Sequence, residues 1–361
     1  MTDVSPRPLL LDLPSPPPGL RAVIAVPARD EAEALPALVA ALAAQHDGAG
    51  GTLLGVEALV VVNNSRDGSA DVARAAAHAA GGTVRVHVAE VALAPHEAHA
   101  GRARQVAMDA AAARVGARGA VLTTDADTRP ASDWVAATLA ELAAGADAVG
   151  GRILLCPDGR AAMPAALRRL VLLDAGYRRA LEAVRHLVAP DAHDPYPRHH
   201  QHFGGSLAVT AAAYARAGGV PAVPALEDVA LVRALQASGA RVRHSDRVRV
   251  WTSARRVGRA SDGLACEMAR WERLAELGRP LLVESADAAV ARLVRLGRWR
   301  RDHASAPPPL ALTDAPHPLV HAEPVERALA GLRAHAARLA ARPFPDRLAE
   351  PVAPRSVRLA A

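Results

Sequence analysis

The sequence predicts an α/β fold, in which a mostly parallel β-sheet is covered by helices on both faces. The first observation is a set of short apolar runs typical of buried strands, at residues 22–26, 58–62, 84–88 and 120–124. The second is that segments with a helical spacing of apolar residues lie between these runs. Since parallel strands need long crossover connections, strands that alternate with helices favour a covered parallel sheet.

The helices of this first half have sequence signals of their own. Leu35, Leu38 and Leu42 share one face of the first helix, Gly81-Gly82 stop the second, and Ser132 can cap the last. The expected helices cover residues 31–44, 69–80, 102–113 and 132 to about 144.

Beyond Val149 the alternation of strands and helices loosens. Apolar residues from Leu167 to Val188 fit one face of a helix, and most of the arginines in this segment lie off that face. A loop rich in His and Pro follows, from Asp191 to His202. The sequence then predicts a strand at 207–210, a helix from about 227 to 237 and a strand at 242–251.

These patterns divide the chain into three parts. Residues 1–19 form an extended leader, because their repeated prolines remove backbone donors and fix φ. Residues 20–261 form the main domain, with a first half at 20–150 and a second half at 151–261. Residues 262–361 form a helical C-terminal extension with a Pro-rich linker near 304–324, which could serve as a lid or as the surface of a homodimer.

The basic residues of this chain are all arginines, and they give it a formal net charge of +6. Arginine suits phosphate, because its planar guanidinium forms bidentate hydrogen bonds, so a phosphorylated ligand is allowed. Aromatic residues make up only 2% of the chain, and the arginines are not interleaved with them. Few side chains could therefore stack on bases, which argues against nucleic acid as a partner.

Cysteine usage and hydropathy indicate a cytoplasmic protein. Cys156 and Cys266 lie far apart and have no zinc-type spacing, so a reducing compartment is expected. No apolar run approaches the roughly 18 residues of a membrane span. The Arg-bearing helix at 167–188 leaves room for peripheral contact with anionic lipid, although packing on the sheet explains its apolar stripe equally well.

Two carboxylates stand at the end of the fourth predicted strand, in Asp125-Ala126-Asp127. The spacing alone is weak evidence, since about three or four such pairs are expected by chance at this acidic content. Their position is more informative, because open α/β sheets bind ligands at the carboxyl ends of their strands. We expect them to hold a divalent cation or a nucleotide; the alternative is a turn that caps the next helix.

Several segments resemble family 2 glycosyltransferases with the GT-A fold, over about residues 21–260. VPARDEAEAL resembles the first strand and loop of that family, VVVNNSRDGSADVA the second strand, GRARQVAMDAA the segment before the DxD motif, and LTTDADTRPASDWV the DxD strand itself. GGSLAVTAAAYARAGGVP and LEDVALVRALQASG resemble the acceptor-side strand and the ED helix. The order of these segments is that of the family, which implies a Rossmann-related GT-A fold.

The resemblance implies a reaction and its central residues. Asp127 would coordinate Mg²⁺ or Mn²⁺ on the diphosphate of a UDP- or GDP-sugar, and Asp125 would bind the ribose or the same ion. Asp228 would take the proton of an acceptor hydroxyl, with Glu227 as its neighbour at the start of a helix. A carboxylate at a helix N-terminus is commonly only a cap, and that setting lowers its pKa.

The resemblance also assigns residues that grip the donor. In the first two loops these are Pro27, Ala28, Asp30, Glu31, Asn63 and Asn64. The asparagines stand where many relatives have Asp-Asp, and an amide both donates and accepts, which leaves uracil and guanine open. A turn after a strand explains the asparagines about as well.

Basic residues near these motifs could hold the diphosphate or an acidic acceptor. Arg102 and Arg104 precede a helix, while Arg255, Arg256 and Arg259 follow the last predicted strand. A solvated basic face is an equally good interpretation for each one singly. The histidines at 193, 199, 200 and 202 lack the spacing of a metal cluster, so we expect loop residues near the acceptor, with a further ligand for the cation as the alternative. His244 is a separate candidate ligand in a predicted strand, where a lone histidine is more often structural.

The leading hypothesis is thus a metal-dependent, inverting sugar transferase. A retaining transferase of the same fold needs no base, and a non-catalytic nucleotide-sugar-binding protein needs no turnover. A nucleotidyltransferase would usually have a first loop with Gly and Lys, which VPARDEAE lacks. A dinucleotide-dependent dehydrogenase would have GxGxxG after the first strand, which is also missing.

Overall fold

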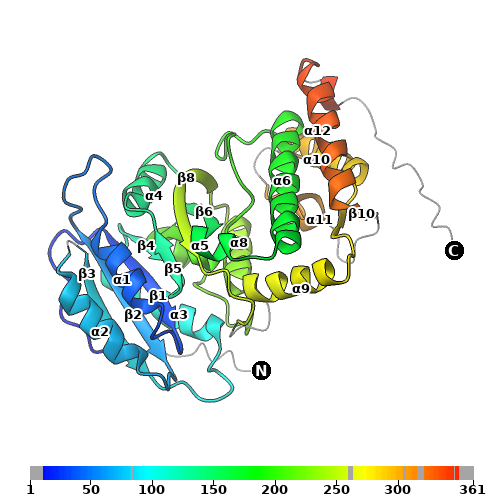
Figure 1. Cartoon of the computed structure of the whole chain (residues 1–361). Helices are drawn as coiled ribbons and strands as arrows, with labels where there is room; N and C mark the ends of the chain where they lie inside the picture. Colours follow the sequence, from blue (N-terminus) through cyan, green and yellow to red (C-terminus); the bar gives the residue numbers. More distant parts are fainter. Residues whose placement is uncertain are drawn as a thin grey trace. The chain divides into compact units, whose positions relative to one another are not determined.

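The computed structural model describes residues 11–82, 84–258, 263–303, 306–314, 321–344 and 346–348. The described residues form two compact units (Figure 1). The sheet unit contains the segments up to Gly159 and from Gln201 to Cys266, and the helical unit contains Arg160–His200 and the segments from Glu267 onward. Residues 1–10 of the expected leader, Arg259, and parts of the expected linker at 304–324 lie outside the described residues.

The sheet unit is built on an eight-stranded sheet in the order β3-β2-β1-β4-β7-β6-β8-β5. Its first four strands are parallel, as is the pair β6–β8, whereas β7 is antiparallel to β4 and β6, and β5 is antiparallel to β8. The strands are β1 (Ala22–Ala28), β2 (Val56–Asn63), β3 (Arg85–Val91), β4 (Ala120–Thr123), β5 (Thr128–Pro130), β6 (Ala148–Leu155), β7 (Leu207–Thr210) and β8 (Val242–Thr252). The predicted α/β class and the six predicted strands are confirmed.

The sequence did not predict β5 or β6. In β6 the apolar pattern is interrupted by Gly150 and Gly151, which weaken the sequence signal of a strand. The structure explains these glycines by close packing: a Cβ at Gly150 would lie 2.5 Å from the Gln201 carbonyl oxygen, and one at Gly151 would lie 2.1 Å from Ser206 Oγ. Residues at these positions must therefore lack a side chain.

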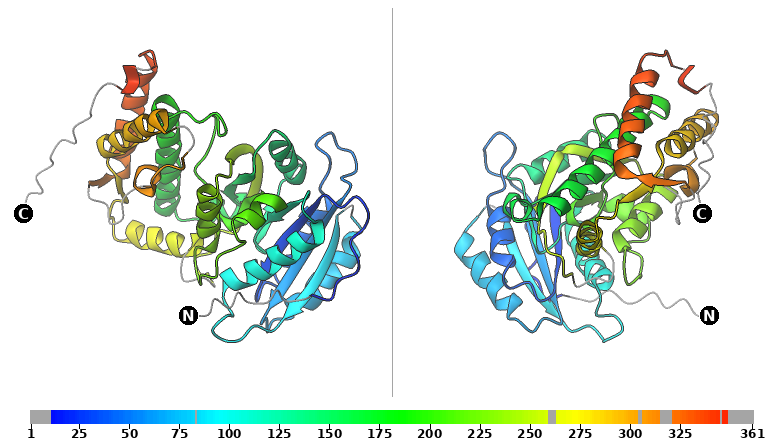
Figure 2. Two further views of the ribbon diagram at one scale, coloured as in Figure 1. Left: turned by 180° about the vertical axis from the view of Figure 1, so that it is seen from behind. Right: turned by 45° about the vertical axis from the view of Figure 1, so that its right-hand side comes forward.

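Helices cover both faces of this sheet. Side chains of β1 alternate between two hydrophobic cores, with Ile24 and Val26 in one and Val23 and Ala25 in the other. The first core is completed by α1, α2 and α4, and the second by α3, α7 and α8, so that α3 crosses the face opposite α1 and α2 (Figure 2). These helices are α1 (Leu35–Ala43), α2 (Ser69–Ala80), α3 (Ala100–Val115), α4 (Trp134–Ala143), α7 (Ala211–Arg216) and α8 (Glu227–Ala237).

The first helix begins four residues later than the sequence predicts, at Leu35 instead of Glu31. The loop before it is held by side chains that follow β2. The backbone N–H of Asp30 donates to Ser65 Oγ at 2.9 Å, and that of Glu31 donates to Ser69 Oγ at 2.8 Å. These contacts hold the loop against the end of β2.

The helical unit is assembled around α6 (Ala165–Val188), which packs against α10 and α12. Its other elements are α9 (Leu264–Glu276), α10 (Ala286–Asp302), α11 (Leu310–Thr313), α12 (Val325–Ala340) and the antiparallel strands β9 (Leu282–Glu284) and β10 (Ala322–Pro324). The short helix α5 (Pro157–Ala161) contains residues of both units, because the division falls after Gly159. The helical C-terminal extension is confirmed. The unit also includes α6 and the His- and Pro-rich loop, which the sequence assigned to the second half of the main domain.

The helical unit has an interior of its own. Arg292 forms a buried bidentate ion pair with Glu284, at 2.6 and 3.0 Å, and the Tyr177 hydroxyl donates to the Glu284 carbonyl oxygen at 3.0 Å. Apolar residues of the α6 stripe, including Leu167, Leu170 and Val184, are buried, and α6 packs against α10 and α12 of the same unit. None of the helices in the described part of the chain combines the length and hydropathy that a membrane crossing requires.

Candidate active site

Strained loops gather where parallel strands end. Three non-glycine residues among those described have left-handed backbone conformations: Asp30 (φ 50°), Asn64 (φ 50°) and Leu226 (φ 55°). Asp30 follows β1, Asn64 follows β2, and Leu226 immediately precedes α8. Such conformations cost free energy and concentrate at functional sites. They draw attention to the loops around the carboxyl end of β4.

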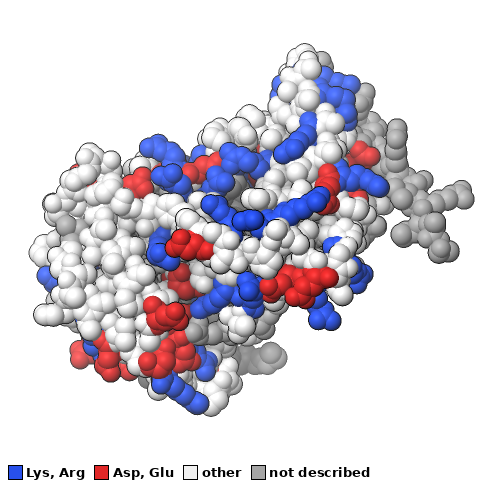
Figure 3. Space-filling view, viewed as in Figure 1, with Lys and Arg blue, Asp and Glu red and all other residues white. Residues whose placement is uncertain are grey.

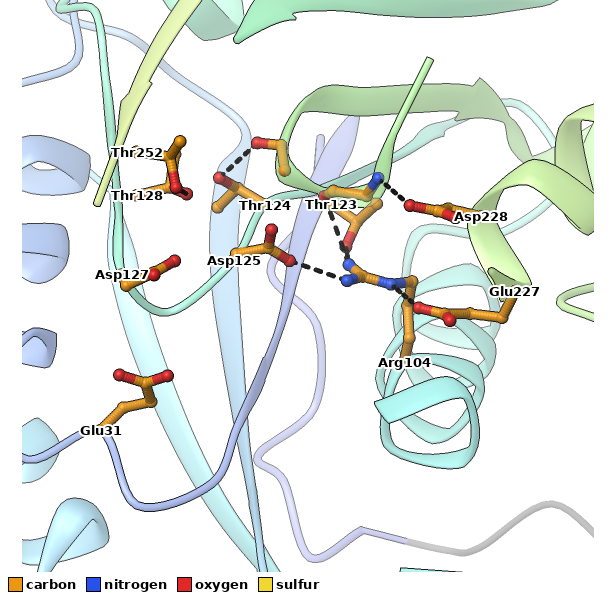
Figure 4. Close-up of polar contacts among 12 residues, drawn as sticks. Glu31, Arg104, Thr123, Thr124, Asp125, Asp127, Thr128, Glu227, Asp228 and Thr252 are labelled. Carbon is orange, nitrogen blue, oxygen red and sulfur yellow. Dashed lines mark hydrogen bonds and ion pairs between the residues drawn. The ribbon is translucent and has the colours of Figure 1, made fainter. Parts of the chain in front are cut away.

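Arg104 of α3 lies at the centre of this region (Figure 4). Its Nη2 donates to Asp125 Oδ1 at 2.7 Å, and its Nε donates to Glu227 Oε1 at 2.8 Å. Its Nη1 donates to Thr123 Oγ1 at 2.9 Å and to the Gly204 carbonyl oxygen at 3.3 Å. The guanidinium thereby joins the end of β4, the start of α8 and the turn before β7.

The environment keeps Arg104 charged. Burial alone would lower the pKa of its guanidinium, but the charges of Asp125, Glu227 and Asp228 raise that pKa above the usual arginine value. Glu227 is equally enclosed, with 7% of its side chain exposed, whereas Asp125 keeps 39% exposed. One oxygen of Asp125 therefore binds Arg104 while the carboxylate still reaches solvent.

Asp228 is held by backbone N–H groups. Its Oδ2 accepts a hydrogen bond from Gly204 at 2.7 Å, and its Oδ1 accepts one from Val229 at 2.7 Å. Burial raises the pKa of Asp228 and outweighs the opposing effects of Arg104 and the Gly204 N–H. The position at a helix start would by itself lower this pKa, so the structure reverses the direction expected for a simple cap.

The second carboxylate of the Asp125-Ala126-Asp127 turn faces a different group of residues. Arg255 Nη2 lies 3.2 Å from Asp127 Oδ2 and 2.9 Å from Glu31 Oε1. Burial and the charge of Asp125 raise the pKa of Asp127 to about 6; Arg255 opposes this, and Glu31 adds to it. Negative charge thus exceeds what Arg255 can offset at this point.

A pair of glycines brings the turn before β7 close to these groups. A Cβ at Gly204 would lie 2.3 Å from Arg104 Cζ, and one at Gly205 would lie 3.1 Å from Asp125 Oδ2. The Thr124 hydroxyl donates to the Gly205 carbonyl oxygen at 2.8 Å. The absence of side chains at Gly204 and Gly205 therefore allows the turn to approach both Arg104 and Asp125.

Comparison with known proteins assigns the part of the chain that carries Glu31, Asp125 and Asp127 to a family. The family model named "Glycosyl transferase family 2" matches residues 23–197. Over these residues the chain is a family 2 glycosyltransferase. The match includes the loops that supply Glu31, Asp125 and Asp127 and the helix α3 that supplies Arg104, and the family resemblance is confirmed.

Solved structures similar to this glycosyltransferase include the mannosyltransferase PcManGT from Pyrobaculum calidifontis in complex with GDP-Man and Mn²⁺. That match has 19% identity, covers 93% of this chain and 80% of the other, and has a TM-score of 0.47. Glucosyl-3-phosphoglycerate synthase from Mycobacterium tuberculosis matches at 16% identity, covering 73% and 82%, with a TM-score of 0.38. TarS from S. aureus matches at 15% identity, covering 79% and 44%, with a TM-score of 0.43. No curated protein sequence matches the chain.

The loops that the resemblance assigns to the donor lie together in the glycosyltransferase. Pro27 and Ala28 end β1, directly before Asp30 and Glu31. The Asp30 carboxylate accepts the backbone N–H of Arg66 at 2.8 Å, which ties the loop after β1 to the loop after β2. Their roles in donor binding remain predictions.

The two asparagines differ in their surroundings. Asn64 Nδ2 donates to the Leu93 carbonyl oxygen at 2.9 Å and Asn64 Oδ1 accepts the Leu93 N–H at 3.1 Å, so its amide fixes a turn. Asn63 is buried at the end of β2, and its Nδ2 has no hydrogen-bond partner among the described residues. Of the two, Asn63 is therefore the one whose amide donor is buried without a partner in the described part of the chain.

Arg102 and Arg104 have separate surroundings on α3. Arg102 Nη1 donates to Gln105 at 2.7 Å, and its Nε lies 3.4 Å from Glu97 Oε1, whereas Arg104 contacts the carboxylates of the site. Residues two apart on a helix point about 200° away from each other, so only one of the pair could face the end of β4. The helical period thus offered a signal that distinguishes Arg104 from Arg102, although the sequence predicts the same role for both, contact with a diphosphate or an acidic acceptor.

The remaining candidates are spread over the two units. Arg256 is exposed, whereas Arg255 lies against Glu31 and Asp127. His202 Nδ1 lies 3.1 Å from His244 Nε2 in the sheet unit, while the histidines at 193, 199 and 200 belong to the helical unit. In the described part of the chain, no three His, Cys, Asp or Glu side chains converge as ligands for a metal ion.

Proposed function

We propose that this glycosyltransferase moves a sugar from a nucleoside-diphosphate donor to a hydroxyl acceptor, with inversion at the anomeric carbon. The observation that carries the proposal is the Arg104 network. One buried guanidinium binds Asp125 on the donor side, and its contacts with Glu227 and the Gly204 carbonyl reach the Asp228 region. An inverting transferase needs its donor-binding residues and its base at neighbouring positions, because the acceptor oxygen that the base deprotonates attacks the anomeric carbon of the bound donor.

On the donor side, the residues present fit a divalent cation. Asp125 and Asp127 offer the oxygen ligands that Mg²⁺ and Mn²⁺ favour, and the pKa of Asp127 is raised first by burial and then by the negative charge of Asp125. A site with two protein carboxylates is sufficient for Mg²⁺, which usually takes its other ligands from water and substrate phosphates. When bound, the cation would neutralise charge that builds on the departing nucleoside diphosphate.

Arg255 completes the donor side of the proposal. In the structure its guanidinium binds Glu31 and Asp127, and it follows β8 on a loop. A guanidinium that lies beside the cation ligands is suited to accept a diphosphate, since Arg binds phosphate oxygens in a bidentate manner. We infer that Arg255 exchanges its carboxylate partners for the diphosphate when the donor enters.

On the acceptor side, Asp228 acts as the base. Its carboxylate takes the proton of the acceptor hydroxyl as that oxygen forms a bond to the anomeric carbon. The bond from this carbon to the diphosphate oxygen breaks at the same time, and its electron pair leaves with the nucleoside diphosphate. The raised pKa of Asp228 makes it a stronger base than an exposed aspartate, and the Gly204 N–H holds one of its oxygens in place.

Glu227 positions these groups without touching the acceptor. With its carboxylate bound to the Nε of Arg104 and its side chain 7% exposed, it orients the guanidinium. We place the reaction in the cytoplasm, which is supported by the free thiols of Cys156 and Cys266. Uracil and guanine both remain open as donor bases, and Asn63 is the residue we expect to discriminate between them.

A transfer assay with UDP- and GDP-sugars tests the proposal. We expect Mn²⁺-dependent transfer, a product with the anomeric configuration opposite to that of the donor by NMR, and loss of transfer in Asp228→Asn. Asp246→Asn is the matched control, because Asp246 is a carboxylate of the sheet unit that pairs with Arg152. A product that retains the donor configuration would establish the retaining alternative. Donor binding without any turnover would establish the non-catalytic one.

A further inference from the structure

A groove lies between α6 and α12 in the helical unit, and none of the residues assigned to sugar transfer lines it. It has a volume of about 450 Å³ and is lined by Arg168, Arg169, Leu172, Gly176, Leu329 and Arg333, among others. Gly176 brings the two helices together, because a Cβ there would lie 3.2 Å from Leu329 Cδ2. The floor of the groove is therefore apolar and closely packed.

The walls of the groove carry excess positive charge. Arg169 lies 3.5 Å from Glu326, and the exposed fractions of the two side chains are 71% and 41%. Within the described ranges, Arg168 and Arg333 form no ion pair. Figure 3 shows basic side chains gathered over the surface that α6 and α12 occupy in Figure 1. A partner of this groove should therefore be anionic.

An exposed apolar side chain stands among these arginines. Leu172 has 57% of its surface exposed, although it lies on a helix whose other large apolar residues are mostly buried. A free anion such as inorganic phosphate would gain nothing from this leucine. An amphiphilic surface would use it, since interfacial helices combine Arg on the polar face with Leu on the apolar face.

We propose that this groove docks the helical unit onto an anionic phospholipid bilayer. Arg168, Arg169 and Arg333 would bind lipid phosphates, which guanidinium groups contact in a bidentate manner, and Leu172 would enter the interfacial layer. The helix α6 lies on the membrane in this arrangement. The proposal does not depend on the sugar transfer proposed above.

Vesicle co-sedimentation of the full chain tests the proposal. The chain should bind vesicles of equal parts phosphatidylcholine and phosphatidylglycerol, should not bind phosphatidylcholine alone, and should bind more weakly as salt is raised. Replacing one groove arginine by Glu should weaken binding by about five-fold or more, since each Arg near an anionic surface contributes on that scale. Arg168→Glu/Arg169→Glu/Arg333→Glu should abolish binding.

A matched control distinguishes binding through the groove from binding through the net charge of the helical unit. Arg279, Arg301 and Arg327 are exposed in the same unit and do not line the groove. Their triple replacement by Glu changes the net charge equally and should leave most of the binding intact. Equal loss in both triple variants, or no binding by the unaltered chain, would overturn the proposal.

Folding and transfer are checked separately. Leu172→Ser keeps every charge and should weaken binding most clearly at high salt, so it tests the groove even if the triple Glu variant fails to fold. If Leu172→Ser and single Arg333→Gln both bind like the unaltered chain, the proposal is wrong. Sugar transfer to a water-soluble acceptor should be unchanged in these variants, so failure of vesicle binding leaves the proposed function untouched.

Discussion

The two units use the same basic residue in opposite ways. In the sheet unit, Arg104 is 7% exposed and binds Asp125 and Glu227 within an internal network. In the helical unit, the Arg169 side chain is 71% exposed, and that of its acidic neighbour Glu326 is 41% exposed. An exposed pair of this kind contributes little to stability, whereas a buried guanidinium is required by the carboxylates around it. Burial and the carboxylates nearby therefore decide whether an arginine organises the interior, as Arg104 does, or can bind a ligand at the surface, as Arg169 can.

The largest effect in this comparison should come from Arg104. Arg104→Met would leave the buried carboxylate of Glu227 without its cation, and we expect a loss of about 3–5 kcal/mol in the free energy of unfolding. Chemical denaturation measures this loss. Arg102→Met, two residues earlier on the same helix, is the matched control and should cost much less. Equal losses in the two variants would contradict the role of Arg104 as the centre of the network.

The proposed base should produce the next effect. Asp228→Asn removes the proton acceptor but keeps an oxygen that can accept the Gly204 N–H, so the fold should persist. We expect kcat to fall by about 10³-fold, within the range of general base catalysis. Steady-state kinetics gives this value, and circular dichroism checks the fold. Unchanged kcat would remove Asp228 from the reaction.

The pKa of Asp228 gives a dependence on pH. Since the charged form is the base and burial raises its pKa, transfer should fall as the pH drops through a value above the ordinary pKa of an aspartate. The folded state holds this proton more tightly than the unfolded chain does. Asp228 therefore lowers the free energy of unfolding as the pH rises through the same window, and Asp228→Asn should remove that decrease. A pH series of kcat/KM and of denaturant unfolding measures both changes.

The turn before β7 should give a smaller effect. Gly204→Ala places a Cβ 2.3 Å from Arg104 Cζ, so the guanidinium must shift away from Asp125 or Glu227. We expect a loss of about 1–3 kcal/mol in stability, as for other overpacked sites, and a lower kcat. Gly258→Ala, at an exposed glycine of the same unit, is the control for thermal melting. A melting temperature equal to that of the unaltered chain would show that the turn has space for a methyl group.

The exposed arginine of the helical unit should give the smallest effect. Arg333→Gln removes a charge from the surface, where substitutions usually change stability by no more than about 0.5 kcal/mol. Thermal melting and transfer to a soluble acceptor should both remain unchanged. A large destabilisation would show that Arg333 has a structural role like that of Arg104, and the contrast between the units would fail.

Much of the fold could be predicted from the sequence, because continuous apolar runs and the glycine that ends α2 are local signals. The predicted cap Ser132 is wrong: Asp133 is the residue before α4, and no side chain among the described residues caps that helix. The predicted bounds of α2 and α8 agree with the structure, and the order of the first four strands along the chain follows from their periodicity. The strand β6 was missed since Gly150 and Gly151 interrupt its pattern for reasons of packing, which involve residues some 50 positions away. Long-range packing of this kind leaves no local signal.

The candidate site could be predicted in part. The motifs identified the carboxylates Asp125, Asp127, Glu227 and Asp228, because their order resembles that of a known family. The central position of Arg104 could not be read from local sequence, since it depends on how α3 meets α8 and the turn at Gly204. The raised pKa of Asp228 likewise results from burial, which opposes the effect expected at a helix start.

The most direct test of the central proposal is calorimetric binding of a nucleoside diphosphate with and without Mn²⁺. We predict that Mn²⁺ strengthens binding to the unaltered chain and to Asp228→Asn, and that it does not do so in Asp127→Asn. This result would show that Asp127 is needed for Mn²⁺-dependent donor binding and that Asp228 is not. Equal Mn²⁺-dependent binding by Asp127→Asn and the unaltered chain would contradict the account.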